Sequence, residues 1–376
     1  MKIAMIGHKR VPSREGGIEV VVEELTRRMV AQGHEVTLYN RRGGHVSGEQ
    51  YEAGIRAKTY EGARIVRVPT PQSRSLNAVV YSFLASLHAL LGGYDVIHYH
   101  AEGPSALLRI PSLFGKCTVS TVHGLDWQRG KWGGFSSKFL LFGEKTLAKK
   151  ARAIIVLSES VQEYFRETYG RAVQFIPNGV NPAKPLPPKE IREKYGLAGG
   201  DYFLFLARLV PEKGIHNLLE AFSGVKTEKK LVIAGGGSHS DAYVKEIQAR
   251  AARDPRVILT GFVQGRCLAE LYSNCQLYVL PSDVEGMPLT LMEAMSYGRP
   301  CLISDIPENT AVAGAFAFSF IKGNTEDLRE KLQRVADGRQ PFPAPAEIAA
   351  DLMARYNWDE VARKTLTVYQ EALSKG

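Results

Sequence analysis

Two glutamates follow an apolar run near residue 280, at positions where carboxylates could bind the hydroxyl groups of a ligand. The segment from Pro281 to Gly298 reads PSDVEGMPLTLMEAMSYG, with Glu285 and Glu293 separated by seven residues. A strand is expected to end just before this segment, and Pro288 suits the first turn of a helix that carries Glu293. Both acids are then expected to face one cleft, while the amides of residues 287–290 would meet a diphosphate.

A pair of cations follows an earlier apolar run. Arg208 and Lys213 are five residues apart in the turn after the run that ends at Leu206, and Lys213-Gly214 leads directly into an expected helix. The guanidinium fork of arginine matches phosphate oxygens, and lysine adds a compact charge, so the pair suits a diphosphate. A solvated basic loop would explain the same two residues if they are taken alone.

A histidine and a glycine pair are further candidates. His123 follows an apolar strand in Thr121-Val-His-Gly, and ligands of open α/β sheets bind at the carboxyl ends of strands. Gly16-Gly17 precedes the first expected helix, where free amides favour an anion. A structural histidine and a tight turn are the plainer alternatives.

Motifs for other nucleotide enzymes are missing from the sequence. Gly7 is followed by HKRVPS, which departs from the Gly-x-Gly-x-x-Gly of dinucleotide-binding proteins. The run Gly235-Gly-Gly-Ser lacks the lysine of a P-loop. A dehydrogenase and a P-loop nucleotidase are therefore disfavoured.

The candidate residues can form one site only if the strand ends that carry them lie close together. The chain alternates short β-branched runs with amphipathic stretches, which is typical of parallel α/β proteins, where strand ends do meet at one edge of a sheet. In the first half we expect strands at Lys2 to Ile6 and Glu35 to Tyr39 and near Ile65, Val96, Val119 and Ile155, with a helix from Ile18 to Gln32. In the second half we expect strands at Tyr202 to Leu206, Leu231 to Ala234 and Val257 to Leu259 and near Tyr278 and Leu302, with helices from Ile215 to Phe222 and Ala242 to Ala251.

The stretch from Pro182 to Pro188 cannot continue a helix or a central strand and marks a domain boundary. We expect one doubly wound domain over residues 1–180, a second over residues 181–345, and C-terminal helices over residues 346–376. The last helix, Trp358 to Leu373, is expected to cross back to the first domain.

Composition agrees with two well-formed cores. The 376 residues exceed what one core usually organises, and 44% hydrophobic with 23% charged residues is typical of a globular protein. The net charge of +9 favours phosphate-rich partners. This positive charge is scattered, without a recognition helix or an aromatic-basic motif, so nucleic acid is not expected as a partner.

Other sequence features bear on compartment and metals. The four cysteines show no paired short spacing and there is no Asp-x-Asp, so we expect a reduced cytoplasmic setting, no metal and no cofactor. The opening residues read as a buried strand and not as a signal peptide. The longest apolar stretch, Ala78 to Leu91, is shorter than the ~20 residues that a spanning helix needs.

In this order along the chain, these motifs resemble those of the retaining glycosyltransferases of family 4, which have the GT-B fold. The family is marked by two glutamates separated by seven residues, and the resemblance extends over essentially the whole chain. It also includes the segment Ile176-Pro-Asn-Gly-Val180. The resemblance implies two Rossmann-like α/β domains that face each other across a cleft. Where the family often has Gly-Gly-x-x-Glu, this chain reads Ser304-Asp-Ile-Pro-Glu-Asn309, which leaves the contacts of that loop open.

The resemblance implies transfer of a hexose or deoxyhexose from a nucleotide diphosphate sugar, with a UDP-sugar favoured, to a glycan or lipid-linked acceptor, with retention and without a metal. It places Glu285 on the sugar, Glu293 on the ribose, and His123 near the transferred sugar. The implied catalytic set is His123, Glu285, Arg208 and Lys213. The implied donor-binding set is Gly16, Gly17, Arg208, Lys213, Val263, Glu285, Gly286, Met287, Pro288, Leu289 and Glu293.

Three alternatives stay open at this point. A nucleotide-sugar epimerase or phosphorylase-like enzyme would share the architecture without transferring sugar to such an acceptor. A basic nucleic-acid-binding protein and a noncatalytic sugar-nucleotide sensor belong to other classes. The segment from Thr121 to Trp132 resembles enzymes of bacterial surface-polysaccharide assembly, which favours a glycan or lipid-linked acceptor.

The stretch from Lys131 to Lys150 could contact an anionic membrane at the inner face of the cell membrane. Its apolar residues can share one helical face, with positive charge nearby. A core-facing amphipathic helix with a solvated basic side is the alternative. The apolar residues are Phe135, Phe139, Phe142 and Leu147, and the basic ones are Lys138, Lys145, Lys149 and Lys150.

Overall fold

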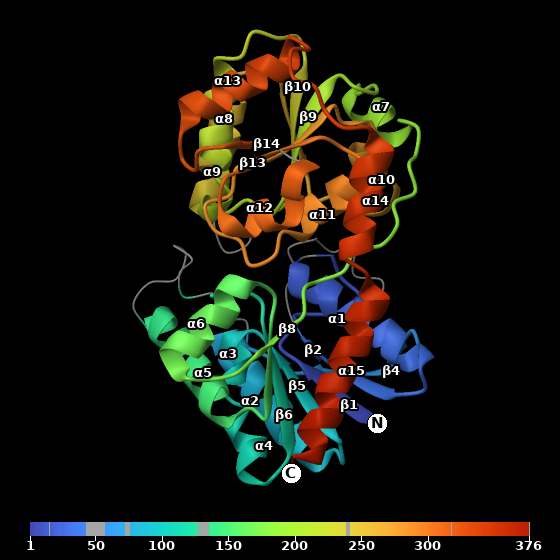
Figure 1. Cartoon of the computed structure of the whole chain (residues 1–376), viewed down its shortest axis with the longest axis vertical. Coiled ribbons are helices and arrows are strands. Elements are labelled where there is room, and N and C mark those ends of the chain that lie inside the picture. The colour runs from blue at the N-terminus through green and yellow to red at the C-terminus, as the bar shows by residue number, and fades with distance from the viewer. Residues whose placement is uncertain are drawn as a thin grey trace. The chain divides into compact units, whose positions relative to one another are not determined.

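The computed structural model describes residues 1–14, 16–42, 57–71, 76–125, 127, 135–237, 241–316 and 318–375. The chain forms two compact units (Figure 1), each with a largely or entirely parallel sheet and helices packed against it. Unit 1 comprises Met1–Gly179 with Trp358–Gly376, and unit 2 comprises Val180–Asn357. Residues 131–134, the start of the expected membrane-binding stretch, lie outside the described residues, and so does the side chain of Phe135.

Within the described residues, the sheet of unit 1 has the strand order β3-β4-β2-β1-β5-β6-β7-β8. All its pairs are parallel except β3 with β4. The order reverses between β1 and β5, so the carboxyl ends of these two strands form the switch point at which open α/β sheets bind ligands. The strands are β1 (Lys2–Ile6), β2 (Glu35–Arg41), β3 (Thr59–Tyr60), β4 (Ala63–Val68), β5 (Val96–His100), β6 (Cys117–Val122), β7 (Ala153–Val156) and β8 (Gln174–Phe175).

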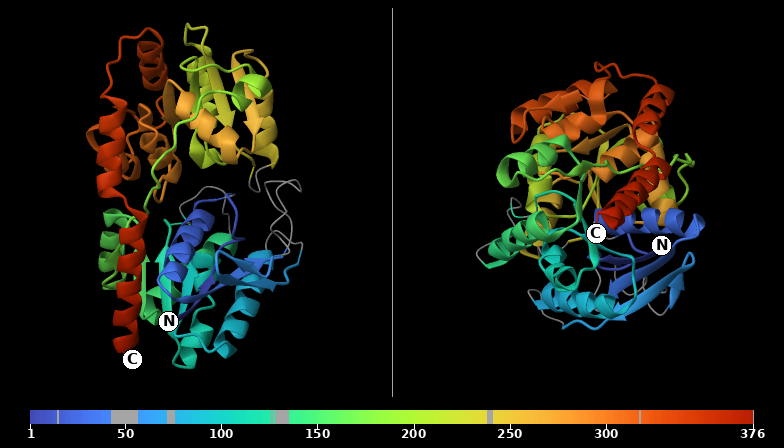
Figure 2. Two further views of the ribbon diagram at one scale, coloured as in Figure 1. Left: turned by 90° about the vertical axis from the view of Figure 1, so that its right-hand side faces the viewer. Right: turned by 60° about the horizontal axis from the view of Figure 1, so that its bottom comes forward.

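The helices of unit 1 form two groups. Helix α15 lies beside α1 and contacts β6 and β7 (Figure 2, red and blue). In the second group α2 contacts α3 and α4, and α5 contacts the same two helices. The helices are α1 (Gly17–Ala31), α2 (Leu76–Leu91), α3 (Glu102–Ser105), α4 (Arg109–Leu113), α5 (Phe135–Lys150), α6 (Glu159–Tyr169) and α15 (Trp358–Ser374).

Helix α15 is tied to unit 1 although it is the last element of the chain. Arg28 Nε donates to Asp359 Oδ1 at 2.6 Å, which joins α1 to α15. Tyr369 is fully buried, and its hydroxyl lies 2.6 Å from His98 Nδ1 on β5. These contacts explain why an amphipathic segment at the end of the chain belongs to the sheet formed at its beginning.

The sheet of unit 2 is entirely parallel among the described residues, in the order β11-β10-β9-β12-β13-β14. Its order reverses between β9 and β12, which is the second switch point. The strands are β9 (Tyr202–Leu206), β10 (Lys230–Ala234), β11 (Val257–Gly261), β12 (Leu277–Leu280), β13 (Cys301–Ser304) and β14 (Phe318–Phe320). The helices are α7 (Glu190–Tyr195), η3 (Pro211–Lys213), α8 (Ile215–Ser223), α9 (Asp241–Ala251), α10 (Gly265–Asn274), α11 (Leu289–Ser296), α12 (Pro307–Ala313), η4 (Gly314–Phe316), α13 (Thr325–Ala336) and α14 (Pro345–Arg355).

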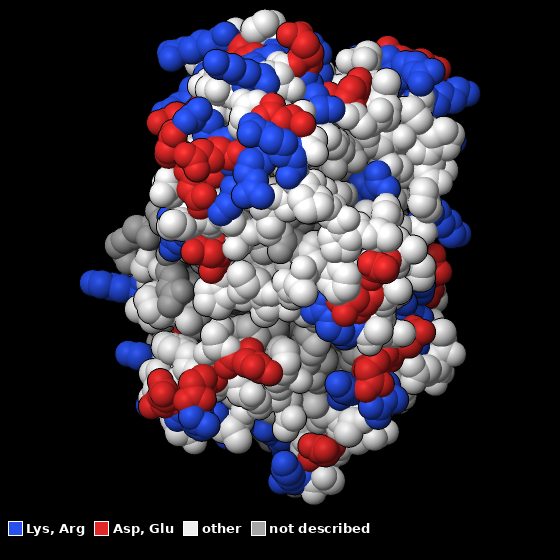
Figure 3. Space-filling view, turned by 45° about the horizontal axis from the view of Figure 1, so that its top comes forward, with Lys and Arg blue, Asp and Glu red and all other residues white. Residues whose placement is uncertain are grey.

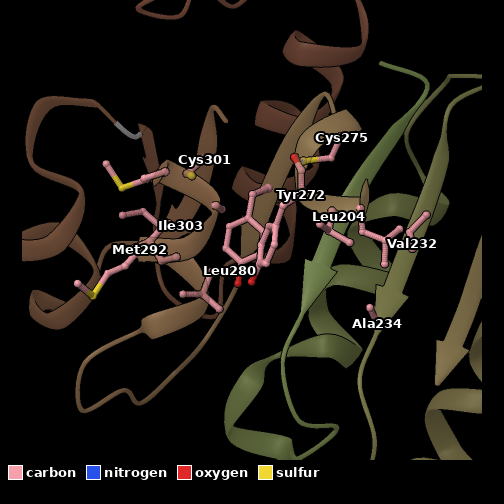
Figure 4. Close-up of a cluster of buried hydrophobic side chains, with 14 of the residues drawn as sticks. Leu204, Val232, Ala234, Tyr272, Cys275, Leu280, Met292, Cys301 and Ile303 are labelled. Atoms are coloured by element: carbon pink, nitrogen blue, oxygen red, sulfur yellow. Dashed lines mark hydrogen bonds between the residues drawn. The ribbon is translucent and has the colours of Figure 1, made fainter. Parts of the chain in front are cut away.

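One core of unit 2 lies between the sheet and helices that include α10 and α11. Figure 4 shows part of it, with Leu204 and Val232 on neighbouring strands, Met292 on α11 and Ile303 on β13. Tyr272 of α10 is buried in the same cluster. This core fixes α11 against β12 and β13, and α11 carries one of the two glutamates.

The doubly wound α/β class expected from the alternation of elements is confirmed by these two sheets. Residues 181–188 form neither helix nor strand, in line with their proline content. The helix boundaries differ from the expected ones by at most one residue, which is within the usual uncertainty of helix ends.

Helix α5 agrees with the second of the two alternatives given for it, a core-facing amphipathic helix with a solvated basic side. Leu147 is fully buried in the core of unit 1, and Phe139 is half-buried. Phe142 is exposed, as are Lys145 and Lys149. The apolar side of α5 therefore serves largely as a core face, because the helix packs against α3 and α4.

Candidate functional site

In unit 2, the turn after β9 is packed directly against the loop after β12. Gly214 has a φ of +66°, and a Cβ at this position would lie 2.0 Å from the carbonyl oxygen of Pro281. Only glycine permits this approach. Asp283 N also donates to the carbonyl oxygen of Glu212 at 2.9 Å. The switch point of unit 2 is thus one connected structure, with Lys213 on one side and Glu285 on the other.

Lys213 and Glu285 form an ion pair, although they lie 72 residues apart in sequence. The two side chains are 13% and 7% exposed, so both charges are largely removed from water. Ser282 Oγ donates to the same carboxylate oxygen, Glu285 Oε1, at 2.7 Å. A largely buried ion pair needs further hydrogen bonds to offset the loss of water, and Ser282 supplies one to this pair.

The support of this pair extends to β13. Ser304 Oγ donates to the carbonyl oxygen of Ser282 at 2.5 Å, and Asn309 Nδ2 donates to Ser304 Oγ at 3.0 Å. These residues belong to the loop that departs from the family pattern. In this chain the loop supports the residue that holds Glu285.

Glu293 lies on α11 and is held by a tyrosine. The Tyr272 hydroxyl donates to Glu293 Oε2 at 3.0 Å, and the Tyr297 ring stacks on Tyr272 with ring centres 5.5 Å apart. Burial, reinforced by the Glu293 carboxylate, raises the pKa of Tyr272 well above its ordinary value, so the hydroxyl keeps its proton. Sequence reasoning missed Tyr272, because no local spacing connects it to Glu293.

The loop before α11 presents backbone amides. Pro288 is the residue before the helix, and its carbonyl oxygen accepts from the amides of Leu291 and Met292, both at 3.1 Å. Leu289 is the first helical residue, so the amides of Leu289 and Thr290 have no acceptor inside the helix and can meet an anion.

The other sequence-predicted residues of unit 2 lie at the same edge of the sheet. Gly286 and Met287 precede α11, and Arg208 follows β9 and is half-buried. Val263 follows β11, is half-buried and packs against the core of unit 2. The segments that follow β9, β11 and β12 therefore supply all of the donor-binding residues expected in this unit, apart from Leu289 and Glu293, which belong to α11.

In unit 1, His123 has a histidine partner. His100 ends β5, and its Nδ1 lies 3.1 Å from His123 Nε2. The His98 ring lies 4.1 Å from that of His100, and His98 Nε2 is 2.8 Å from Thr121 Oγ1. Sequence reasoning selected His123 alone, although the His-Tyr-His run of β5 was a readable signal for the other two.

Burial keeps these partners uncharged. It lowers the pKa of His98 to about 3, and it lowers the pKa of His100 well below its ordinary value. His8, which follows β1, has a pKa lowered to about 4 by burial and lies 2.9 Å from Asn40 Oδ1. Neutral imidazoles at the switch point of unit 1 can each donate one hydrogen bond and accept another.

The start of α1 already contains a carboxylate. Glu19 is 4% exposed, and its Oε1 accepts the amide of Lys9 at 2.8 Å. A Cβ on Gly16 would lie 2.6 Å from Glu19 Oε2, so this carboxylate lies against the residue that precedes the helix. Gly17 begins the helix. Sequence reasoning proposed an anion near Gly16 and Gly17 and did not foresee the acid beside them.

The described residues contain neither a metal-binding cluster nor a membrane-spanning helix. Over these residues no group of three or more His, Cys, Asp or Glu side chains is gathered as a metal site. In the same ranges no helix is both long and apolar enough to cross a membrane. On the face shown in Figure 3, lysine and arginine side chains are interspersed with acids and do not form one continuous stripe.

Comparisons with known proteins agree with this architecture. Residues 15–184 match the model of Glycosyltransferase Family 4, and residues 188–350 match that of Glycosyl transferases group 1. The two matches together span most of the chain.

Similar proteins carry the same assignment. An uncharacterized glycosyltransferase of Methanocaldococcus jannaschii, MJ1607, is 26% identical, and the alignment covers 99% of each chain. The UDP-Gal:alpha-D-GlcNAc-diphosphoundecaprenol alpha-1,3-galactosyltransferase of Escherichia coli is 29% identical over 61% of this chain and 63% of its own. The structure of Alr3699/HepE from Anabaena, in complex with UDP and glucose, has a TM-score of 0.80 and 18% identity, covering 99% of this chain and 100% of that one.

These matches decide between the transferase and the alternatives raised from the sequence. The chain belongs to the family 4 glycosyltransferases and has the GT-B fold.

Proposed function

We propose that the protein transfers a hexose or deoxyhexose from a UDP-sugar to a glycan or lipid-linked acceptor, with retention of anomeric configuration and without a metal, at the cytoplasmic side of a membrane. The observation that carries the proposal is the contact of Lys213 with Glu285 at the switch point of unit 2. Two relatives support the choice of substrates: one was solved with UDP and glucose, and another is named for a diphosphoundecaprenol-linked acceptor.

The diphosphate is the group that most needs stabilisation, because the nucleoside diphosphate leaves as an anion. The Lys213 ammonium donates to Glu285, and its compact positive charge at the switch point suits phosphate oxygens. Arg208 adds a guanidinium at the end of β9, and the amides of Leu289 and Thr290 add neutral donors. In a site shielded from water, loss of one such donor costs about 3 kcal/mol of transition-state stabilisation.

The two glutamates take different roles in this proposal. Glu285 is held by Lys213 and Ser282 through Oε1, so its second oxygen is oriented to accept from a sugar hydroxyl. Glu293 is held by Tyr272 through Oε2 and accepts from ribose hydroxyls. A carboxylate fixed before the ligand arrives loses little side-chain entropy on binding.

His123 is proposed to lie near the transferred sugar. Because His100 stays neutral, it can hold His123 in one tautomer by a single hydrogen bond. The acceptor hydroxyl must lose its proton during transfer, and the departing phosphate oxygen takes it up in the balanced reaction.

The first experiment identifies the donor. Thermal unfolding is recorded with UDP-, GDP-, dTDP- and ADP-sugars, and a UDP-sugar is expected to give the largest rise in Tm. NMR of the transfer product should show the anomeric configuration of the donor. An inverted product would refute retention, and stabilisation by another nucleotide alone would refute the choice of uridine.

The second experiment tests the cations. Transfer is expected to continue in saturating chelator, while Arg208→Ala and Lys213→Ala each slow it at least about tenfold. Because Lys213→Ala leaves Glu285 buried without its cation, its folded fraction must be measured by Tm beside the rate. Activity lost in chelator and restored by magnesium or manganese would contradict the metal-free reaction.

A further inference from the structure

Large exposed apolar side chains gather on three neighbouring helices of unit 1. Among the described residues seven large apolar side chains are exposed, and six of them lie on α2, on α5 or at the end of α4. Leu91 is 87% exposed, Leu113 72% and Phe114 69%. The six are Phe83, Leu87, Leu91, Leu113, Phe114 and Phe142, and we call them the apolar surface. The seventh, Ile321, belongs to unit 2.

The three helices present these residues on one side of unit 1. Phe83, Leu87 and Leu91 are spaced by four residues, so they share one face of α2. Helix α4 contacts both α2 and α5. The three helices lead into β5, β6 and β7, so their last residues lie at the amino ends of these parallel strands. This edge is opposite to the carboxyl edge that holds His100 and His123.

The charges that the three helices themselves expose have one sign, although Asp95, four residues after Leu91, is an exposed acid. The only acid of α2, α4 and α5 is Glu144, which is fully buried. It accepts hydrogen bonds from the side chains of Trp127, Tyr164 and Tyr169. The exposed charged side chains of these helices are Arg109, Lys138, Lys145, Lys149 and Lys150.

Exposed apolar side chains together with exposed basic side chains indicate which kind of partner binds this face. Association with a second copy through this face would bring like charges together, which is costly. An anionic lipid surface offers acyl chains to the apolar side chains and head-group charges to the lysines. We propose that the outer face of α2, α4 and α5 docks on an anionic lipid bilayer. The inference goes beyond the proposed reaction. It assigns docking to the exposed residues of three helices and not to the apolar side of α5 alone, because Leu147 on that side is buried in the core.

The test is cosedimentation of the full-length chain with vesicles, without any sugar nucleotide. Vesicles of phosphatidylcholine with phosphatidylglycerol should bind the parent chain, vesicles of phosphatidylcholine alone should bind it weakly, and salt should weaken binding. The variant Leu91→Ser with Phe114→Ser should bind at least about tenfold more weakly, because it removes exposed apolar area. Its control is Ile321→Ser in unit 2.

A second pair of variants separates local charge from net charge. Lys145→Glu with Lys149→Glu should weaken binding at least about 25-fold, since each basic residue near an anionic surface is worth about fivefold. Lys226→Glu with Lys245→Glu changes two exposed lysines of unit 2 by the same charge and should have a much smaller effect.

Several outcomes would overturn the inference. These are no binding of the parent chain to anionic vesicles, unchanged binding by the serine variant, or an equal loss in both lysine variants. A parent dimer in sedimentation without lipid that the serine variant dissociates would identify a second copy as the occupant instead. All variants should keep the Tm of the parent and its response to the donor nucleotide, so failure of docking is distinguishable from failure of the proposed transfer reaction.

Discussion

Replacement of Gly214 by alanine should damage unit 2 far more than the same replacement at Gly196. The two glycines have the same backbone, each with a φ of +66°, so an alanine costs about 1–2 kcal/mol at either position for its left-handed conformation. A Cβ at Gly196 meets nothing within 4 Å, whereas one at Gly214 lies 2.0 Å from the Pro281 carbonyl oxygen. Relief of that overlap requires the loop before Glu285 to move, at a further cost of about 1–3 kcal/mol.

The two costs can be separated by calorimetry. For a unit of this size each kcal/mol lowers Tm by about 2–4 °C, so Gly196→Ala should lower the Tm of unit 2 by about 2–8 °C and Gly214→Ala by about 4–20 °C. Gly214→Ala should also weaken binding of the donor nucleoside diphosphate in titration calorimetry, since the moved loop carries Glu285, while Gly196→Ala should bind as the parent does. Equal Tm shifts with unchanged binding would refute the argument that this close approach positions the site.

Three further predictions concern individual side chains. Lowering the pH from 7 to 5 should destabilise unit 1, because the unfolded chain binds a proton on His98 near pH 6.5 whereas the folded chain does so only near pH 3. His98 contributes about 1.4 kcal/mol per pH unit below 6.5. His98→Gln should reduce the slope of Tm against pH and leave the contributions of His8 and His100, and an unchanged slope would contradict this. Glu293→Gln should chiefly weaken nucleotide binding and Glu285→Gln should chiefly lower kcat; equal losses of affinity for the free nucleoside diphosphate would refute the separate roles. Tyr272→Phe removes one hydrogen bond to Glu293, so donor affinity should fall about fivefold with kcat kept, and a reduced kcat at unchanged affinity would count against its positioning role.

Some residues of the candidate site could be predicted from the sequence and others could not. Arg208, Lys213 and Glu285 could be selected from the sequence because each follows an apolar run that ends a strand, and strand ends are where parallel sheets bind ligands. Tyr272 and His100 were not selected. Their roles depend on contacts with Glu293 and His123, which are 21 and 23 residues away, and no local pattern encodes such contacts.

The membrane-binding prediction for α5 also depended on contacts that the sequence does not reveal. Helical periodicity in the sequence correctly placed Leu147 and Phe139 on one side of a helix, but periodicity does not say whether an apolar side meets the core or the solvent. Packing of α5 against α3 and α4 decided this, and the exposed apolar residues are found mainly on α2 and α4.

The sequence by itself determined the class of fold and the order of its strands along the chain, because alternating hydrophobic periods and turn residues act locally. It also determined which residue types were available for a diphosphate and a sugar. Only the tertiary structure decided the order of strands within each sheet, and this order creates the switch points that bring Lys213 to Glu285 and His100 to His123. Strand order depends on which edges pair and which faces are buried together, and these are interactions between residues far apart in the chain.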